Sequence, residues 1–327
     1  MGEFAKIFRK VNGLKVLSQY WKGHVLFHAL FSTLLEGTDR KSLEIVRLST
    51  ENRLGKNLRK KYRKYIDDFK NANQECSRGT NPPIIWFCWL QGIDNAPEIV
   101  RMCYESIKQI NGYAVKVITF DNINDYINLP PFIVNKHKRG IIGNAHFADI
   151  IRLELLIKHG GTWIDSTVFC SNKHVPDFYL KSDLFVYRIL KPGLDGHYMS
   201  SSNWFISARQ NNKVLRLTRN LLYEYWKKHN DVIDYYIFHY FFELALEAYP
   251  EEAAHIPPVS SEPPHMLLLR LFDIYDENIY RSIMEQTCFH KLTYKFEDGD
   301  IEKDNTYYRH IMSLKSDRHN SLLCSEL

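Results

Sequence analysis

The alternation of apolar and polar residues divides the chain into a helical N-terminal segment and a longer stretch of alternating strands and helices. In residues 1–75, apolar side chains recur at helical spacing with basic residues between them. The polar stretch 71–83 contains Gly and two prolines and indicates a boundary. We therefore predict a basic helical segment over residues 1–75 and a second domain over residues 80–327.

The second domain opens with a continuous apolar run, IIWFCW at residues 84–89, that is typical of a buried parallel strand. An amphipathic helix and a second strand follow and complete a β-α-β unit, and a helix over residues 147–158 is expected to end at Gly160-Gly161. This alternation of strands and helices predicts an α/β fold with a mostly parallel sheet flanked by helices. The remaining predicted strands are residues 162–169, 181–189 and 203–208, and the remaining predicted helices are 211–229, 232–249 and 265–286.

Positive charge is concentrated in the N-terminal segment. Residues 1–70 carry 16 Lys and Arg against 7 Asp and Glu, whereas the remaining residues carry 27 against 31. Many of these basic residues lie within residues 53–64, interleaved with Leu58, Tyr62 and Tyr65. They can form a solvent-exposed helix face, contact an anionic membrane surface, or bind nucleic acid. Because no nucleic-acid-binding motif accompanies them, we expect no nucleic-acid partner.

The longest apolar run, His24–Leu35, is shorter than the ~20 residues that span a bilayer. The N-terminal residues lack the features of a signal peptide, and the six cysteines show no paired spacing. These features predict a cytoplasmic protein.

Three charged residues stand out in the apolar stretch HFADIIRLELLIKHGGTWIDSTVFC, residues 146–170. Asp149 and Arg152 are three apart and share one helix face, which by itself is also typical of a surface ion pair. In TWIDSTVF, a period of two places Trp163, Asp165 and Thr167 on one face. Asp165 follows a Gly-Gly turn at a strand end, where ligands of parallel sheets bind; it can hold a divalent cation or simply cap a turn.

This stretch resembles the core of retaining, A-type glycosyltransferases of the bacterial capsular polysaccharide synthesis family (glycosyltransferase family 32), which is related to the clostridial glucosylating toxins. The shared pattern is an Asp, an Arg three residues later, a Gly-Gly, an aromatic residue, and an Asp-x-Asp motif that begins sixteen residues after the first Asp. The resemblance covers residues 82–170 closely and 200–295 more loosely, and it does not extend to residues 1–70. The second motif acid is replaced by Thr167, which places metal affinity in doubt.

The resemblance implies roles for individual residues. Asp149 and Arg152 would bind the donor sugar and serve catalysis, Trp89 would stack on uracil, and Ser166 would lie in the donor site. Trp86 is expected to pack in the core instead. Asp165, Thr167 and His290 would hold Mn²⁺ or Mg²⁺.

Two further stretches carry candidate residues. In CFHKLTYK (288–295), the resemblance assigns Lys291 or Lys295 to the diphosphate, although a solvated basic turn would look the same. Asp234, before an aromatic helix, is a candidate for the space beneath the anomeric carbon, or an N-cap. Ser201, Ser202 and Asn203 are further candidates for the sugar pocket.

Taken together, the resemblance implies a retaining hexosyltransferase of capsule biosynthesis. It would use a UDP-sugar, with galactose or glucose expected, and a lipid-linked (undecaprenyl-pyrophosphate) oligosaccharide acceptor. The basic N-terminal segment would attach it peripherally to the inner face of the bacterial plasma membrane. The alternatives are a non-catalytic nucleotide-sugar or membrane-binding module, which Thr167 would explain, and a nucleic-acid-binding protein.

Overall fold

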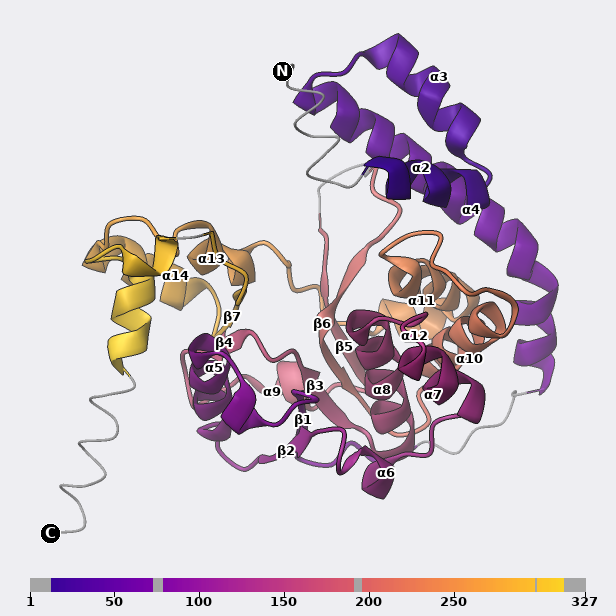
Figure 1. Ribbon diagram of the computed structural model, residues 1–327. Coiled ribbons are helices and arrows are strands. Elements are labelled where there is room, and N and C mark those ends of the chain that lie inside the picture. Colours follow the sequence, from indigo (N-terminus) through magenta and orange to yellow (C-terminus); the bar gives the residue numbers. More distant parts are fainter. Residues whose placement is uncertain (1–12, 73–78, 191–195, 298, 315–327) are drawn as a thin grey trace, which may run out of the picture.

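The structure is a computed structural model that describes residues 13–72, 79–190, 196–297 and 299–314 (Figure 1). Its strands are β1 (Ile84–Cys88), β2 (Ala114–Ile118), β3 (Gly161–Ile164), β4 (Val168–Cys170), β5 (Leu184–Arg188), β6 (Ser201–Ala208) and β7 (Phe289–Lys291). The longer helices are α2 (Gly13–Lys22), α3 (Leu26–Glu36), α4 (Arg40–Ala72), α5 (Glu98–Lys108), α7 (Pro131–Lys138), α8 (Asn144–His159), α10 (Lys213–Lys228), α11 (Ile237–Ala248) and α14 (Glu277–Gln286). Short helices are α6 (Ile123–Tyr126), α9 (Asp177–Leu180), α12 (Pro250–Ala254) and α13 (Met266–Leu269), with 3₁₀ turns at Ile93–Asn95, Pro263–His265 and Asp300–Glu302.

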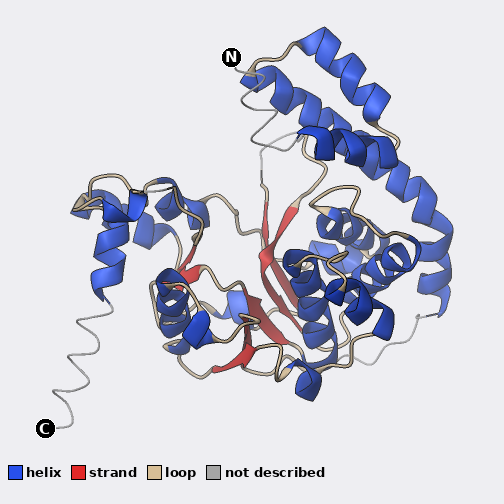
Figure 2. Ribbon diagram, viewed as in Figure 1, coloured by secondary structure: helices blue, strands red, loops and turns tan. Residues whose placement is uncertain are grey.

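Five strands form the central sheet in the order β2-β1-β3-β6-β5 (Figure 2). β1 pairs in parallel with β2 and β3, whereas β6 is antiparallel to both of its neighbours. Four strands therefore share one direction and β6 opposes them. This arrangement confirms the predicted α/β fold with a mostly parallel sheet and flanking helices. β4 and β7 form a separate, antiparallel two-stranded sheet.

The sheet is covered on both faces, which is why β1 reads as a continuous apolar run. Ile85 and Phe87 belong to one core cluster, together with Cys103 and other residues of α5. Trp86 points to the opposite side, into a second cluster built with α8, α10 and α11. Its side chain is 1% exposed and its Nε1 donates to the Gly160 carbonyl at 2.8 Å, so it is a core residue, as predicted.

The predicted strand TWIDSTVF is interrupted. β3 ends at Ile164, the chain turns at residues 165–167, and β4 begins at Val168 in the other sheet. The turn is held by Asp165 N–H, which donates to the Trp204 carbonyl, and by Val168 N–H, which donates to the Asp165 carbonyl. The prediction of one continuous strand was wrong: the Asp165 bond extends the β3–β6 pairing by one residue, and the local turn then directs the chain away from β6 to pair with β7.

The N-terminal helices pack onto this α/β body. Leu54, Leu58, Tyr62 and Ile66 of α4 are buried in the same cluster as Trp86, whereas the basic residues between positions 53 and 64 are exposed. The predicted boundary at residues 76–79 lies largely outside the described residues, and the division into two domains stays a prediction. Within the part of the chain that the structure describes, no helix combines the length and apolar composition needed to cross a bilayer.

Candidate functional site

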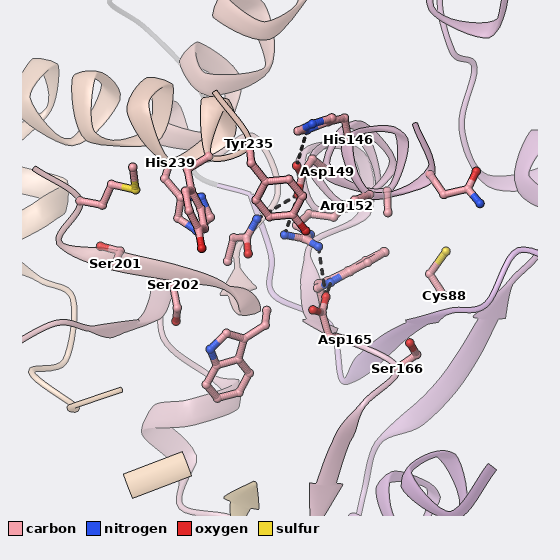
Figure 3. Close-up of a pocket in the computed structure, with 18 of the residues that line it drawn as sticks. Cys88, His146, Asp149, Arg152, Asp165, Ser166, Ser201, Ser202, Tyr235 and His239 are labelled. Carbon is pink, nitrogen blue, oxygen red and sulfur yellow. Dashed lines mark hydrogen bonds and ion pairs between the residues drawn. The ribbon is translucent and has the colours of Figure 1, made fainter. Parts of the chain in front are cut away.

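A cavity of about 780 Å³ opens at the carboxyl ends of β1 and β3. Cys88 and Trp89 contribute from the end of β1, and Asp165 and Ser166 from the turn after β3. Because β6 runs the other way, its first residues (201–203) reach the same edge of the sheet. Figure 3 shows Asp149 and Arg152 of α8 facing Asp165, with Tyr235 and His239 across from them. The cavity therefore lies where open α/β sheets bind ligands.

Arg152 joins two carboxylates at the floor of this cavity. Its Nη1 lies 3.0 Å from Asp149 Oδ1, and its Nη2 donates to Asp165 Oδ1 at 3.1 Å. The guanidinium group also lies over the rings of Trp163 and Phe238, with centroid distances of 4.9 and 5.6 Å. Because its side chain is only 5% exposed, this is a buried ion chain and not the surface pair that sequence spacing alone also allowed.

Helix geometry explains how Asp149 and Arg152 meet. Asp149 and Arg152 are separated by three residues on α8, and Gly160 ends this helix with φ of 69°. Asn203 Nδ2 at the start of β6 donates to Asp149 Oδ1 at 2.9 Å, and His146 Nδ1 lies 3.7 Å from Asp149 Oδ2. The carboxylate is therefore oriented by groups from both α8 and β6.

The Asp165 carboxylate is also held on every side. Oδ1 accepts from Trp163 Nε1 at 2.9 Å in addition to Arg152, and Oδ2 accepts from Lys291 Nζ at 3.1 Å. Burial alone would raise the pKa of Asp165, but the charges of Lys291 and Arg152 hold it below its ordinary value. Asp165 is therefore ionised at neutral pH.

Lys291 also reaches the third residue of the motif. Its Nζ donates to Thr167 Oγ1 at 2.7 Å, and Thr167 is 5% exposed. The antiparallel pairing of β4 with β7 places Lys291 opposite Val168, which fixes the lysine beside the turn. The structure thus brings Asp165, Thr167 and Lys291 together, but as an ion pair with a hydroxyl group and not as a set of free oxygen ligands.

The structure does not bring His290 into this group. Neighbouring residues of a strand point to opposite faces, so His290 faces away from Lys291. It is 0% exposed, its Nε2 lies 3.1 Å from Ser171 Oγ, and burial lowers its pKa to about 3. The expectation that His290 completes a metal site is corrected accordingly.

Asp234 does not line the cavity either, although the two tyrosines that follow it do. Its Oδ1 accepts from the Tyr236 backbone N–H at 2.7 Å, just before α11. Burial raises the pKa of Asp234. Asp234 therefore stabilises a local turn, and the alternative of an N-cap is not met either, since the N-cap of α11 is Tyr236.

Trp89 and Tyr294 form an aromatic part of the cavity lining. Their ring centroids are 5.4 Å apart at an interplanar angle of 86°, and Lys295 Nζ lies 5.9 Å from the Tyr294 centroid. Trp89, Tyr294 and Ser166 line the cavity, whereas Lys295 is exposed beside it. An aromatic surface of this kind offers a flat nucleobase a stacking partner.

Several lining residues were not singled out from the sequence. Arg47 and Glu51 come from α4, and Arg47 Nη1 donates to Glu51 Oε1 at 2.7 Å. Burial raises the pKa of Glu51. His239 of α11 lines the cavity with a buried Nδ1 that makes no hydrogen bond, and burial lowers its pKa to about 4. No local signal in the sequence marks α4 as part of the site. His239 lies five residues after the candidate Asp234, and this proximity is the signal that could have found it.

Comparison with known proteins identifies the family. The model of the family described as "Capsular polysaccharide synthesis protein" matches residues 33–311. No curated protein matches the chain. A solved structure named PaToxG Glycosyltransferase is similar over 81% of this chain and 98% of that chain, at 15% identity and a TM-score of 0.37, which is too low to establish a common fold.

The family match begins within α3, so it includes the helix α4 that the motif resemblance had left out. It also supports the prediction that the protein is a glycosyltransferase. The resemblance recognised in the Asp-Arg-Gly-Gly-Asp pattern is confirmed, and the chain belongs to the capsular polysaccharide synthesis protein family.

Proposed function

We propose that the protein is a retaining glycosyltransferase of the A type, which transfers a hexose from a UDP-sugar to a lipid-linked oligosaccharide. The observation that carries this proposal is the ion chain Asp149–Arg152–Asp165 at the floor of a cavity beyond the strand ends. Galactose and glucose are the donor sugars we expect. The family membership agrees with a role in building a surface polysaccharide.

Two groups of residues in and beside the cavity suit the two parts of a sugar nucleotide. Trp89, packed against Tyr294, would stack on the base. Asp149, oriented by Asn203 and Arg152, would accept hydrogen bonds from the sugar hydroxyls. Lys291, beside Asp165, would lie near the diphosphate.

The proposed reaction needs no nucleophile from the protein. The acceptor hydroxyl attacks the anomeric carbon from the leaving-group side, the new glycosidic bond forms, and the bond to the β-phosphate oxygen breaks. The β-phosphate takes the proton of the hydroxyl group. The protein then contributes orientation and stabilisation of the negative charge on the leaving diphosphate.

A nucleotide-release assay tests this proposal. The full chain would be incubated with UDP-, GDP-, dTDP- and CDP-sugars and a membrane glycolipid extract as acceptor. We expect one UDP-hexose to be turned over, and Asp149→Asn to lower the rate by about 10²- to 10³-fold. Asp177→Asn, an exposed helical acid paired with Lys181, is the matched control and should leave the rate unchanged. Nucleotide binding without turnover of any donor would instead identify a non-catalytic module.

We further propose that the N-terminal helices contact an anionic membrane surface, where a lipid-linked acceptor resides. On α3 the residues Phe27, Leu30, Phe31, Leu34 and Leu35 are 52–81% exposed and form a stripe at helical spacing. The adjacent helices carry exposed basic residues: Lys15 on α2, and Arg40 and Lys41 at the start of α4. An apolar stripe with flanking cations is typical of a helix that lies in the interface of an anionic bilayer.

Vesicle flotation tests this contact. We expect the protein to float with phosphatidylglycerol vesicles, and Leu30→Ser/Leu34→Ser to weaken binding at least about tenfold, since two exposed leucines would be withdrawn from the bilayer. Leu269→Ser/Ile274→Ser removes two leucine-sized side chains that are 71% and 78% exposed on the C-terminal part, and should have no effect. Loss of binding only after neutralising Lys60, Lys61 and Lys64 would show that the basic face of α4 makes the contact instead.

A further inference from the structure

We infer that the ammonium group of Lys291 occupies the place of a divalent cation beside Asp165, so that donor binding and transfer proceed without a metal ion. This inference rests on the proposed function, because it concerns the diphosphate end of the same site. It replaces the expectation of Mn²⁺ or Mg²⁺ held by Asp165, Thr167 and His290.

The oxygen atoms of Asp165 are committed to nitrogen donors. Oδ1 accepts from Trp163 and Arg152, and Oδ2 accepts from Lys291 at 3.1 Å. Mg²⁺ requires oxygen ligands at about 2.0–2.1 Å and several of them at once. A metal ion at Oδ2 would therefore have to displace the ammonium group and lie close to Lys291 and Arg152, whose charges already balance those of Asp165 and Asp149.

The other expected ligands do not compensate. The Thr167 hydroxyl already accepts from Lys291 at 2.7 Å, and His290 is fully buried on the opposite face of β7. Among the described residues, no three His, Cys, Asp or Glu side chains are grouped so as to hold an ion. The donor set present beside Asp165 thus does not fit a divalent metal.

Lys291 can serve the role of the divalent cation at the diphosphate. An ammonium group has three N–H donors, and Asp165 and Thr167 accept from two of them. The third remains available to a phosphate oxygen; the side chain is 20% exposed and does not itself line the cavity, but its partner Asp165 does. Arg152, bound to the same carboxylate, adds a second fixed positive charge at this end of the cavity. Together they supply charge to a leaving diphosphate, which is the function that a metal ion serves in other sites.

Calorimetry with UDP tests the inference on the full chain. We expect the dissociation constant of UDP in EDTA to equal that in 1 mM MnCl₂ within about twofold. Electron paramagnetic resonance should find no stoichiometric Mn²⁺ on the UDP complex. Binding that appears only with Mn²⁺ would overturn the inference and leave the proposed function standing. No UDP binding under either condition would overturn both.

Variants sharpen the test. Lys291→Ala should weaken UDP binding in EDTA by about 10- to 100-fold, the value of a charged hydrogen bond. Lys181→Ala, which removes an exposed lysine paired with Asp177, is the control and should bind as the wild type does. The double variant Lys291→Ala/Thr167→Asp creates an Asp-x-Asp motif, and we expect it to bind Mn²⁺ and to recover UDP binding only with that ion. Unchanged UDP binding by Lys291→Ala would overturn the inference.

Discussion

Replacing Arg152 with Met is expected to abolish most activity and to lower the free energy of unfolding by about 3–5 kcal/mol. The guanidinium group is buried between Asp149 and Asp165, at 3.0 and 3.1 Å. Met keeps the length of the side chain but leaves the buried carboxylate of Asp149 without its guanidinium partner, and leaves Asp165, 26% exposed, with Lys291 alone. Breaking such a group by removing one partner is costly because the remaining charges stay desolvated.

In Arg152→Met the loss of activity should be larger than the loss of folding stability alone would cause. Arg152 sets the position of Asp149 and of Asp165, so both the sugar end and the diphosphate end of the proposed site lose their orientation. We expect a decrease of at least about 10²-fold in kcat/KM, because misplacement by about 1 Å suffices for that. Arg152→Lys keeps the charge but not the planar group that reaches two carboxylates and stacks on Trp163, and it should restore little.

Urea unfolding and initial-rate measurements at 25 °C check this prediction. Arg219→Met is the matched control. Arg219 of α10 pairs at 3.4 Å with Glu154 of α8, the helix that carries Arg152, and lies over Tyr223, but it is 22% exposed and does not line the cavity. It should cost no more than about 1 kcal/mol and leave kcat/KM unchanged. The variant Asp149→Asn/Arg152→Met removes one of the stranded charges, and should recover part of the stability without recovering activity. Equal unfolding midpoints for Arg152→Met and the wild type would contradict the description of a buried, coupled ion chain.

Sequence patterns predicted the parts of this site that depend on local geometry. A spacing of three on a helix is enough to place Asp149 and Arg152 on one face, and a Gly-Gly stop followed by a strand is enough to place Asp165 near the sheet edge. These relations hold wherever the helix packs. The α/β fold follows from the same kind of local evidence, because a short apolar run such as IIWFC, followed by an amphipathic helix and a second strand, is typical of a strand covered on both sides.

The predictions that were wrong concern features that depend on pairing between distant segments of the chain. The chain leaves the central sheet after Asp165 because β4 pairs with β7, more than a hundred residues later, and the sequence TWIDSTVF does not indicate that partner. The register of β7 against β4 then decides that Lys291, and not His290, faces Asp165. A one-residue difference in register exchanges the two side chains, so their roles could not be read from their order.

The contribution of α4 was hidden for a different reason. Its basic and apolar residues alternate as on any amphipathic surface helix, and Arg47 and Glu51 resemble an ordinary intrahelical pair. Only the packing of Leu54, Leu58 and Tyr62 against the core brings this part of the helix to the cavity. α4 lines the cavity through Arg47 and Glu51 and also packs against α3. The proposed membrane contact on α3 therefore lies on a helix that is next to the proposed site, where a lipid-linked acceptor would have to enter.

Gly161→Ala should lower stability by about 3–5 kcal/mol, and through it the activity, although it adds a single methyl group at a residue that does not line the cavity. Gly161 begins β3 with φ of 92°, a conformation that an L side chain adopts only with strain. A Cβ at this position would lie 2.5 Å from the Ile84 carbonyl oxygen of the neighbouring strand and 3.3 Å from Trp86 Nε1. β3 must then move away from β1, and Asp165, four residues later, moves with it.

Gly112→Ala separates backbone strain from the steric clash with β1. Gly112 also has a positive φ, 78°, but a Cβ added there would meet nothing within 4 Å. It should cost only about 1–2 kcal/mol of backbone strain, less the gain from a stiffer unfolded chain. Urea unfolding of both variants gives the difference, and calorimetry with UDP shows whether the donor site has shifted in Gly161→Ala under conditions where it is still folded. We expect the larger loss of stability, and weakened UDP binding, in Gly161→Ala alone. Equal effects of the two substitutions would mean that backbone strain dominates and that the close approach of β3 to β1 does not position Asp165.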